Sequence, residues 1–427
     1  MRPFQSPGFR IYYGAQFMAF VGYWALEMAR AFLALQVGGS AAALGSLLMA
    51  LAIPSLLFSL HGGVVSDSND TRKIIRICRS LLAISALCFF FLLKSGTELK
   101  LWMLYAFTFF EGCVMAYDSP AYMATLQRLV PQKDFKMAVV LQSTNFHLSR
   151  AAGPAIGGAI MSFYGVEYVF LFTLAAYMYI AFIIGKAKYI RNFKFETPVK
   201  ESRKRFQGVQ DILDAFKYFW GRKGLKYKLV QYFLTLSVLI PVIHVVYRSF
   251  LKFKFDLNGD EFGFLFSFPA AGAMTAAIIF IIVKYEDPIR NLRFAVPVLS
   301  LLVLAMAFVP NTKVAAILLA LTGLFQYFTV NSITQSLHFQ IDEQYRGRLG
   351  SIISLSFGAV MPLMSYPFAA VADKYGYRIA MLGPLCVFVL GSLFLAIKYG
   401  KLKFMAVPAR RKRDKERIPE TTSNPLQ

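Results

Sequence analysis

The feature that most constrains this chain is a succession of long apolar segments, each close to the roughly 20 residues that an α-helix needs to cross a bilayer. Hydrophobic residues make up 57% of the 427 residues and charged residues only 16%, which is too apolar for a soluble domain of this length. We therefore expect an all-α membrane protein with twelve transmembrane helices. The predicted spans are Ile11–Leu35, Ala42–Val65, Ile74–Leu93, Leu101–Ala124, Met137–Tyr164, Val166–Gly185, Leu229–Phe250, Phe262–Val283, Phe294–Val309, Val314–Leu337, Leu349–Ala372 and Ile379–Ile397.

Basic residues are distributed unevenly among the loops. If the N-terminus lies in the cytoplasm, most of the 46 Lys and Arg residues fall on cytoplasmic segments. Because Lys and Arg in short loops set the orientation of membrane proteins, we expect a multi-pass inner-membrane protein with both termini in the cytoplasm. The formal net charge of +23 is then a topology signal. No nucleic-acid partner is expected, since the basic residues do not line one face.

A long polar stretch divides the predicted helices six and six. Residues 1–188 should form one six-helix bundle, residues 189–228 a cytoplasmic linker and residues 229–399 a second bundle, while the charged and polar tail 400–427 should be disordered. An internal repeat supports this division, because a basic loop, a helix with Gly or Pro and a closing Tyr-Gly occur in both bundles. Apolar residues at helical spacing predict an amphipathic surface helix in the linker: Val209, Ile212, Leu213, Phe216 and Phe219.

The loop between the second and third spans reads G-V-V-S-D-S-N-D-T-R-K from Gly63 to Lys73. It resembles the loop motif G-x-x-x-D-R-x-G-R-K of the major facilitator superfamily and keeps its Gly, its Asp and its terminal basic pair. The resemblance implies a monomeric transporter built of two pseudo-symmetric six-helix bundles, in which this loop takes part in gating by facing the start of the eleventh helix. The residues concerned are Gly63, Asp67, Arg72, Lys73, Arg346 and Arg348.

A second stretch combines Asp118-Ser119-Pro120-Ala121 with G-P-A-I-G-G from Gly153 to Gly158. It is similar to the fourth and fifth helices of the enterobactin-exporter branch of that superfamily. That branch usually has Asn-Pro-Ala-Arg where this chain has Asp118-Ser119-Pro120-Ala121. Independently of the resemblance, Gly153, Gly157 and Gly158 allow close helix contact, and Pro154 bends the axis. Plain small-residue packing explains the same pattern equally well.

Ionisable and polar side chains recur at helical spacing within several predicted spans. Ionisable groups at bilayer depth cost several kcal/mol unless they face water or a partner, so we expect these stripes to converge on a central cavity and to contact the substrate. The candidate substrate-binding residues are Tyr23, Glu27, Arg30, Tyr117, His147, Arg150, His244, Arg248, Tyr327, Asn331 and Gln335. Glu111 and Asp118, seven residues apart on one face of the fourth helix, are candidates for proton coupling.

A purely structural explanation pairs Glu27 with Arg30 and Glu111 with Arg150. It does not extend to His244 and Arg248, which have no acidic partner in their own helix. The balanced or slightly cationic set favours an anionic or zwitterionic small molecule, because Arg binds carboxylates in a bidentate manner. A siderophore is the leading candidate, and the resemblance points the same way.

These features predict a secondary transporter that exports a siderophore in a proton-coupled manner by alternating access. Siderophore import, multidrug export and lysophospholipid flipping on the same fold remain open. An enzyme is not expected, because no nucleophile elbow or catalytic constellation is present. The four cysteines and four histidines form no metal-binding spacing, so neither a metal site nor a cofactor is expected.

Overall fold

The structure is a computed structural model in which the described chain is almost entirely helical. It describes residues 2–131, 134–186, 218–283, 288–338, 340–341, 349, 352–353 and 356–400, and these ranges contain no strand. The predicted amphipathic linker helix, except for its last residues, and the predicted disordered tail lie outside the described residues. Both remain predictions.

The first half of the chain folds into six long helices. After a short 3-10 turn, η1 (Arg2–Gln5), they are α1 (Pro7–Gly38), α2 (Ala41–Ser68), α3 (Thr71–Lys94), α4 (Leu101–Leu129), α5 (Phe135–Phe163) and α6 (Glu167–Lys186). The first three helices begin after a polar N-cap residue. Ser6, Ser40 and Asp70 each accept a backbone hydrogen bond from the first turn of the helix that follows. Gly39, at φ +56°, permits the sharp turn between α1 and α2.

The second half contains interrupted helices. Its elements are α9 (Lys223–Leu234), the π-helical turns η3 (Thr235–Leu239) and η4 (Val242–Val246), α10 (Tyr247–Phe255), α11 (Gly259–Leu265), α12 (Phe268–Val283), α13 (Pro288–Met306), α14 (Thr312–His338), the π-helical turn η6 (Ser356–Val360), α16 (Met361–Tyr375) and α17 (Tyr377–Gly400). The elements from α9 to α10 form one continuous apolar rod, Gly224–Phe255. This rod corresponds to the seventh predicted span.

Eight of the described helical segments are long and apolar enough to cross a membrane. They are Pro7–Gly38, Ala41–Ser59, Thr71–Lys94, Glu167–Lys186, Gly224–Phe255, Gly259–Phe280, Thr312–His338 and Tyr377–Lys398. Helices α4, α5, α13 and α16 lie at the four remaining predicted positions. Since they are more polar or shorter, their crossing of the membrane stays a prediction.

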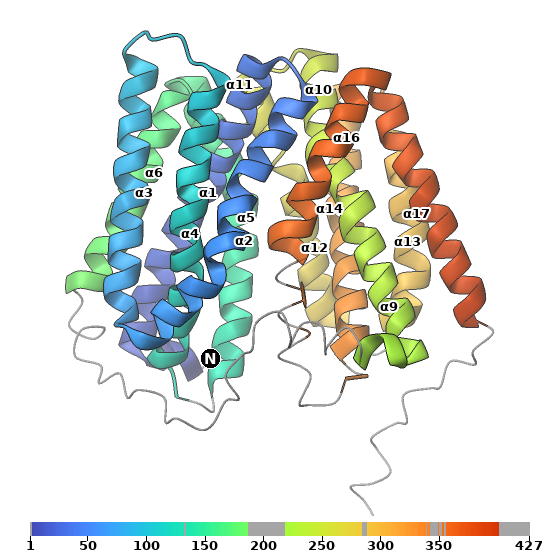
Figure 1. Cartoon of the computed structure of the whole chain (residues 1–427), viewed down its shortest axis with the longest axis horizontal. Helices are drawn as coiled ribbons and strands as arrows, with labels where there is room; N and C mark the ends of the chain where they lie inside the picture. Colours follow the sequence, from blue (N-terminus) through green and yellow to red (C-terminus); the bar gives the residue numbers. More distant parts are fainter. Residues whose placement is uncertain are drawn as a thin grey trace, which may run out of the picture.

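The helices form two bundles side by side, α1–α6 and α9–α17 (Figure 1). Within the first bundle α2 packs on α4, α3 on α6 and α1 on α5; within the second, α12 and α13 both pack on α14. The main contacts between the bundles join α2 to α16 and α5 to α11 and α12. This architecture confirms the predicted all-α membrane fold of two bundles.

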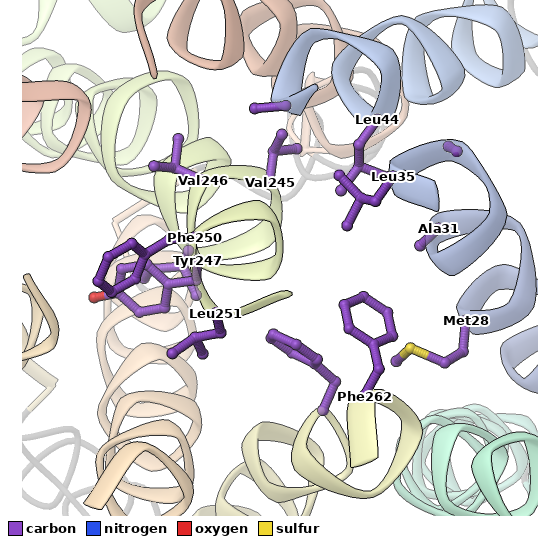
Figure 2. Packing of buried hydrophobic residues seen from close by; sticks show 14 of the residues in the cluster. Met28, Ala31, Leu35, Leu44, Val245, Val246, Tyr247, Phe250, Leu251 and Phe262 are labelled. Carbon is purple, nitrogen blue, oxygen red and sulfur yellow. The ribbon is translucent and has the colours of Figure 1, made fainter. Parts of the chain in front are cut away.

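The two bundles are held together at the end of the molecule opposite to the N-terminus (Figure 1). Met28, Leu35 and Leu44 of α1 and α2 belong to the same buried cluster as Val245 and Phe262 of the second bundle, and Figure 2 shows these apolar side chains facing one another. In a bilayer such contacts stabilise the interface through close van der Waals packing, because lipid chains are as apolar as these side chains. An apolar plug therefore closes this end of the molecule.

Polar contacts join the bundles at the same closed end. The carboxylate of Asp373, at the end of α16, accepts hydrogen bonds from the backbone N–H groups of Ala41 (2.8 Å) and Ala42 (2.7 Å) at the start of α2. A negative charge at a helix N-terminus is stabilised by the helix dipole and the unpaired N–H groups there. Asp373 therefore acts as an interdomain cap for α2.

The predicted boundary between the linker and the second bundle lies inside α9. The prediction began this bundle at Leu229, whereas α9 begins at Lys223. The charged residues of this turn have partners: Lys226 lies over the Trp220 ring at 4.1 Å, and the Lys228 Nζ atom donates to the Ser336 carbonyl (3.1 Å). Long basic side chains can extend along a helix end in this way, so the helix continues beyond the predicted span, and the domain boundary stays a prediction.

Candidate functional site

A cavity of about 130 Å³ lies between the two bundles. Its walls come from α1, α5, the rod from α9 to α10, the region of α11 and α12, α14 and η6. The lining residues are Trp24, Glu27, Arg150, Pro154, Ile243, His244, Arg248, Phe266, Pro269, Ala270, Ala273, Gly323, Gln326, Tyr327, Val330, Asn331 and Phe357. Six of the predicted substrate-binding residues meet here: Glu27, Arg150, His244, Arg248, Tyr327 and Asn331.

The local backbone of the second bundle explains how two cationic candidates reach one wall. His244 lies inside the π-helical turn η4, which follows Pro241, and Arg248 lies four residues later in α10. Pro241 cannot donate the usual backbone hydrogen bond, and π-turns are frequent at functional sites because they re-aim side chains. The interrupted helix therefore presents both residues to the cavity.

Glu27 and Arg248 form an ion pair that bridges the two bundles. The Arg248 guanidinium donates to both carboxylate oxygens of Glu27, at 2.6 and 3.3 Å. Both side chains are about 12% exposed. A bidentate pair of this kind is a strong charge-assisted contact, and its partial exposure leaves it accessible from the cavity.

Arg150 lies beside this pair in a different environment. Its Nη2 atom is 3.3 Å from His244 Nε2, and its guanidinium lies 5.1 Å from the centre of the Trp24 ring. Because Arg has only donors, His244 Nε2 must accept this hydrogen bond, so the imidazole is neutral. Among the described residues, no carboxylate lies within 4.0 Å of Arg150. The cavity wall thus carries two guanidinium groups and one carboxylate.

Other candidates are sealed inside the first bundle. Arg30 forms an ion pair with Glu111, and Arg79 forms a bidentate pair with Asp118 at 2.6 and 3.1 Å. All four side chains are at most 3% exposed. The proton-coupling candidates Glu111 and Asp118 therefore lie apart from the central cavity, each neutralised by an arginine.

The observed pairing differs from the structural pairing considered from the sequence. Glu27 binds Arg248 rather than Arg30, and Glu111 binds Arg30 rather than Arg150. Arg79 was not among the predicted site residues, although it lies inside the third predicted span, Ile74–Leu93, in the first half of α3. The sequence did offer a signal for it: a carboxylate inside a predicted span, such as Asp118, requires a cationic partner, and Arg79 lies inside the neighbouring span.

The remaining polar candidates lie elsewhere. The Tyr117 hydroxyl is 3.0 Å from His61 Nδ1 on α2, and Tyr23 packs edge-on against Trp24 with ring centres 5.3 Å apart. Gln335 lies on α14 but does not line the cavity. For His147 only the backbone, within α5, is described. Conversely, the cavity includes Trp24 and Gln326, each adjacent in sequence to a predicted residue.

The predicted gating loop occupies the turn between α2 and α3. Asp67 and Lys73 are exposed, whereas Arg72 binds Asp70, with its Nε 2.9 Å from Oδ1. This hydrogen bond from Arg72 holds the pKa of the Asp70 carboxyl below its usual value. Arg346 and Arg348 lie outside the described residues, so their predicted contact with Asp67 stays a prediction.

Small residues allow close helix contact at two places in this region. A Cβ atom on Gly63 would have open space around it, but one on the neighbouring Gly62 would lie 2.2 Å from the Ala116 carbonyl oxygen of α4. In α5, Gly153 and Gly157 face α1 at Trp24 and Ala25, and Gly158 faces Gly263 of α11. Pro154 lines the cavity. The glycine motif therefore packs α5 against both its own bundle and the opposite one.

Comparison with known proteins places this geometry in context. A sequence profile of the transmembrane secretion effector family, a group of major facilitator proteins, matches residues 1–421. The staphyloferrin A transporter of Staphylococcus aureus is 24% identical over 392 residues, which cover 88% of this chain and 94% of that protein.

Solved structures with a similar fold are transporters. A POT family transporter in complex with 5-aminolevulinic acid aligns with a TM-score of 0.70 at 12% identity, covering 92% of this chain and 96% of that one. A bacterial homologue of the iron transporter ferroportin in the inward-facing state aligns with a TM-score of 0.66 at 17% identity, covering 91% of this chain and 98% of that one. At these identities the likeness concerns the fold.

Proposed function

Because the chain belongs to the transmembrane secretion effector family of the major facilitator superfamily, we propose that it exports a siderophore-class anion across the inner membrane. Both termini lie in the cytoplasm in this proposal, and protons supply the driving force. The siderophore class is supported by the staphyloferrin A transporter, to which the chain is similar over 88% of its length.

The observation that carries the proposal is the environment of Arg150. Its guanidinium faces a cavity between the bundles and, among the described residues, has a neutral imidazole and an aromatic ring beside it but no carboxylate partner within 4.0 Å. A charge at bilayer depth is costly unless it is paired or solvated. An anionic substrate would supply the missing partner, and a carboxylate or catecholate would match the planar donor fork of Arg.

The ion pair between Glu27 and Arg248 provides a link between binding and movement. It joins α1 of one bundle to α10 of the other. A substrate anion bound at Arg150 can also compete for Arg248, because both guanidinium groups line the same cavity. Release of Glu27 would then loosen a contact between bundles that must rock against each other in alternating access. Binding of the cargo thereby promotes the transition.

The state described by the structure fits the start of an export cycle. The bundles meet through the apolar plug around Leu35, Leu44 and Val245 and through the Asp373 cap of α2. Under the predicted topology this closed end faces outward, so the cavity of the described state is reached from the cytoplasmic side. Glu111 and Asp118 are our candidates for proton coupling, since protonation of either carboxylate would release its arginine partner.

Cationic-drug export is a weaker alternative for this cavity. A cation would meet two guanidinium groups against one carboxylate, and like charges in a poorly solvated site repel each other. Import of a ferric siderophore would use the same anion site and differ only in the direction of transport. A deletion strain distinguishes the two directions. A lysophospholipid flippase would require a lateral entrance to the central cavity.

A deletion strain tests the proposal. We expect cells without the chain to retain newly made siderophore inside, and expression of the wild-type chain to restore its secretion. The chain with Arg150→Gln should fail to restore it, whereas Arg10→Gln, the same substitution at an exposed arginine, should restore it fully. Mass-spectrometric quantification of siderophore in cells and medium provides the readout.

Two outcomes would contradict the proposal. Normal secretion by the deletion strain, combined with loss of ferric siderophore uptake, would identify an importer. Secretion restored equally by the Arg150→Gln and wild-type chains would remove the central cavity from the transport route.

A further inference from the structure

A groove with a larger volume than the central cavity lies apart from it. It has a volume of about 630 Å³ and lies within the second bundle, between α9, α13, the end of α14 and α17. This size falls within the roughly 300–1,000 Å³ typical of ligand pockets. The transport mechanism described above makes no use of it.

The groove opens toward the surrounding bilayer. Helices α13 and α17 lie at the outer side of the second bundle (Figure 1), and apolar lining residues on both are strongly exposed: Leu301 by 63% and Leu393 by 54%. Val296, Leu304, Leu385 and Val389 continue the apolar wall. In a membrane protein this surface meets lipid chains rather than water.

The length of the groove matches one leaflet. On α13 its lining runs from Leu292 to Leu304, a rise of about 18 Å, and on α17 from Leu385 to Ala396, a rise of about 16 Å, at 1.5 Å per residue. Half of a hydrocarbon core of roughly 30 Å is about 15 Å. An acyl chain of a single leaflet would therefore fit along the groove.

The charged side chains of the groove are both cationic and lie at one end, whereas Ser300 and Ser392 add only hydroxyl groups along the wall. Lys228, Arg293, Tyr227 and Gln231 line this end, and no Asp or Glu lines any part of the groove. Lys228 is 8% exposed, and Arg293 is exposed. Outside the groove, Lys226 over Trp220 and Arg222 over Tyr218 add interfacial aromatic and basic residues at the same end. Such residues mark the headgroup level of a bilayer.

We propose that this groove binds one anionic phospholipid of the leaflet at the end of the molecule where α1 and α9 begin. The phosphate of the headgroup lies at Arg293 and Lys228, and one acyl chain follows the apolar wall between α13 and α17. The charge at the polar end selects an anionic headgroup over a zwitterionic one. The groove is thus a lipid site on the moving second bundle, distinct from the substrate cavity.

Native mass spectrometry of the purified full chain tests the proposal with two probes, dioleoylphosphatidylglycerol and dioleoylphosphatidylcholine, which have identical acyl chains. The wild-type protein should retain phosphatidylglycerol preferentially. Arg293→Gln should reduce this retention about fivefold, the effect of one surface cation on an anionic lipid. Arg378→Gln, an exposed arginine at the other end of the same bundle, should leave it unchanged.

A second pair of variants tests the acyl-chain part of the site. Val389→Trp fills the groove and should abolish retention of both lipids, whereas Val387→Trp, at an exposed position two residues away outside the groove, should not. Thermal unfolding of each variant in detergent shows whether it is folded. Equal retention of the two lipids by the wild-type protein, or full retention by folded Val389→Trp, would overturn the proposal.

Discussion

Replacing Asp118 with Asn should lower the free energy of unfolding by about 3–5 kcal/mol, because it leaves the buried Arg79 charge without its neutralising partner. Both side chains are at most 2% exposed and share two hydrogen bonds at 2.6 and 3.1 Å. Thermal or denaturant unfolding of the purified protein in detergent measures the effect.

Two control variants make this result interpretable. Asp67→Asn, the same change at an exposed aspartate in α2, should alter the free energy of unfolding by about 0.5 kcal/mol or less. The double variant Arg79→Gln with Asp118→Asn removes both charges and retains hydrogen-bonding groups, so it should recover most of the lost stability. Wild-type stability of the Asp118→Asn protein would show that the pair does not hold α3 against α4.

The double variant also separates structural from functional roles. Once it is folded, its transport in proteoliposomes can be measured against an imposed pH gradient. Loss of the proton dependence in this stable protein would support a coupling role for Asp118. A retained proton dependence would leave the pair with a structural role and make Glu111 the remaining candidate.

Replacing Arg150 with Gln should weaken binding of an anionic siderophore by about 3 kcal/mol, or roughly 100-fold, the upper range for a hydrogen bond to a charged group. The reason is that Arg150 is the cavity cation with no described carboxylate within 4.0 Å, so the substrate would be its counter-ion. Arg248, already paired with Glu27, should contribute less. Titration calorimetry with the purified protein gives the dissociation constants.

Arg150→Lys distinguishes charge from geometry. It keeps the positive charge but cannot form a bidentate fork with a carboxylate, so its dissociation constant should lie between those of the wild-type and Gln proteins. Arg10→Gln controls for loss of one positive charge in general. An unchanged dissociation constant for folded Arg150→Gln would show that the substrate binds elsewhere.

The helices could be predicted from the sequence because the signal is local. A spanning segment of about 20 apolar residues must pair its own backbone N–H and C=O groups in a bilayer, and only a helix does so within one segment. Such a segment can be recognised in the sequence without knowing which helices pack around it. The extension of α9 beyond the predicted span is less visible in the sequence. Lys226 and Lys228 read as loop residues, although the helix continues through them and they contact an aromatic ring and a carbonyl group.

The partners of the buried charges could not be predicted, because they depend on distances between helices. Spacing along α1 placed Glu27 near Arg30, yet the carboxylate reaches Arg248 in the opposite bundle. Tyr117 was a candidate for substrate contact, yet its hydroxyl lies 3.0 Å from His61 Nδ1 of α2 and it does not line the central cavity. One-dimensional patterns indicate which side chains need a partner, whereas packing decides which partner each of them finds.

The central claim is that a cavity between the two bundles holds a negatively charged cargo against Arg150. The most direct test measures the affinities of a carboxylate siderophore and of its methyl ester for the wild-type and Arg150→Gln proteins. We predict that esterification weakens binding to the wild-type protein by roughly 100-fold and changes binding to Arg150→Gln little. Equal affinities of the acid and the ester for the wild-type protein would contradict the claim.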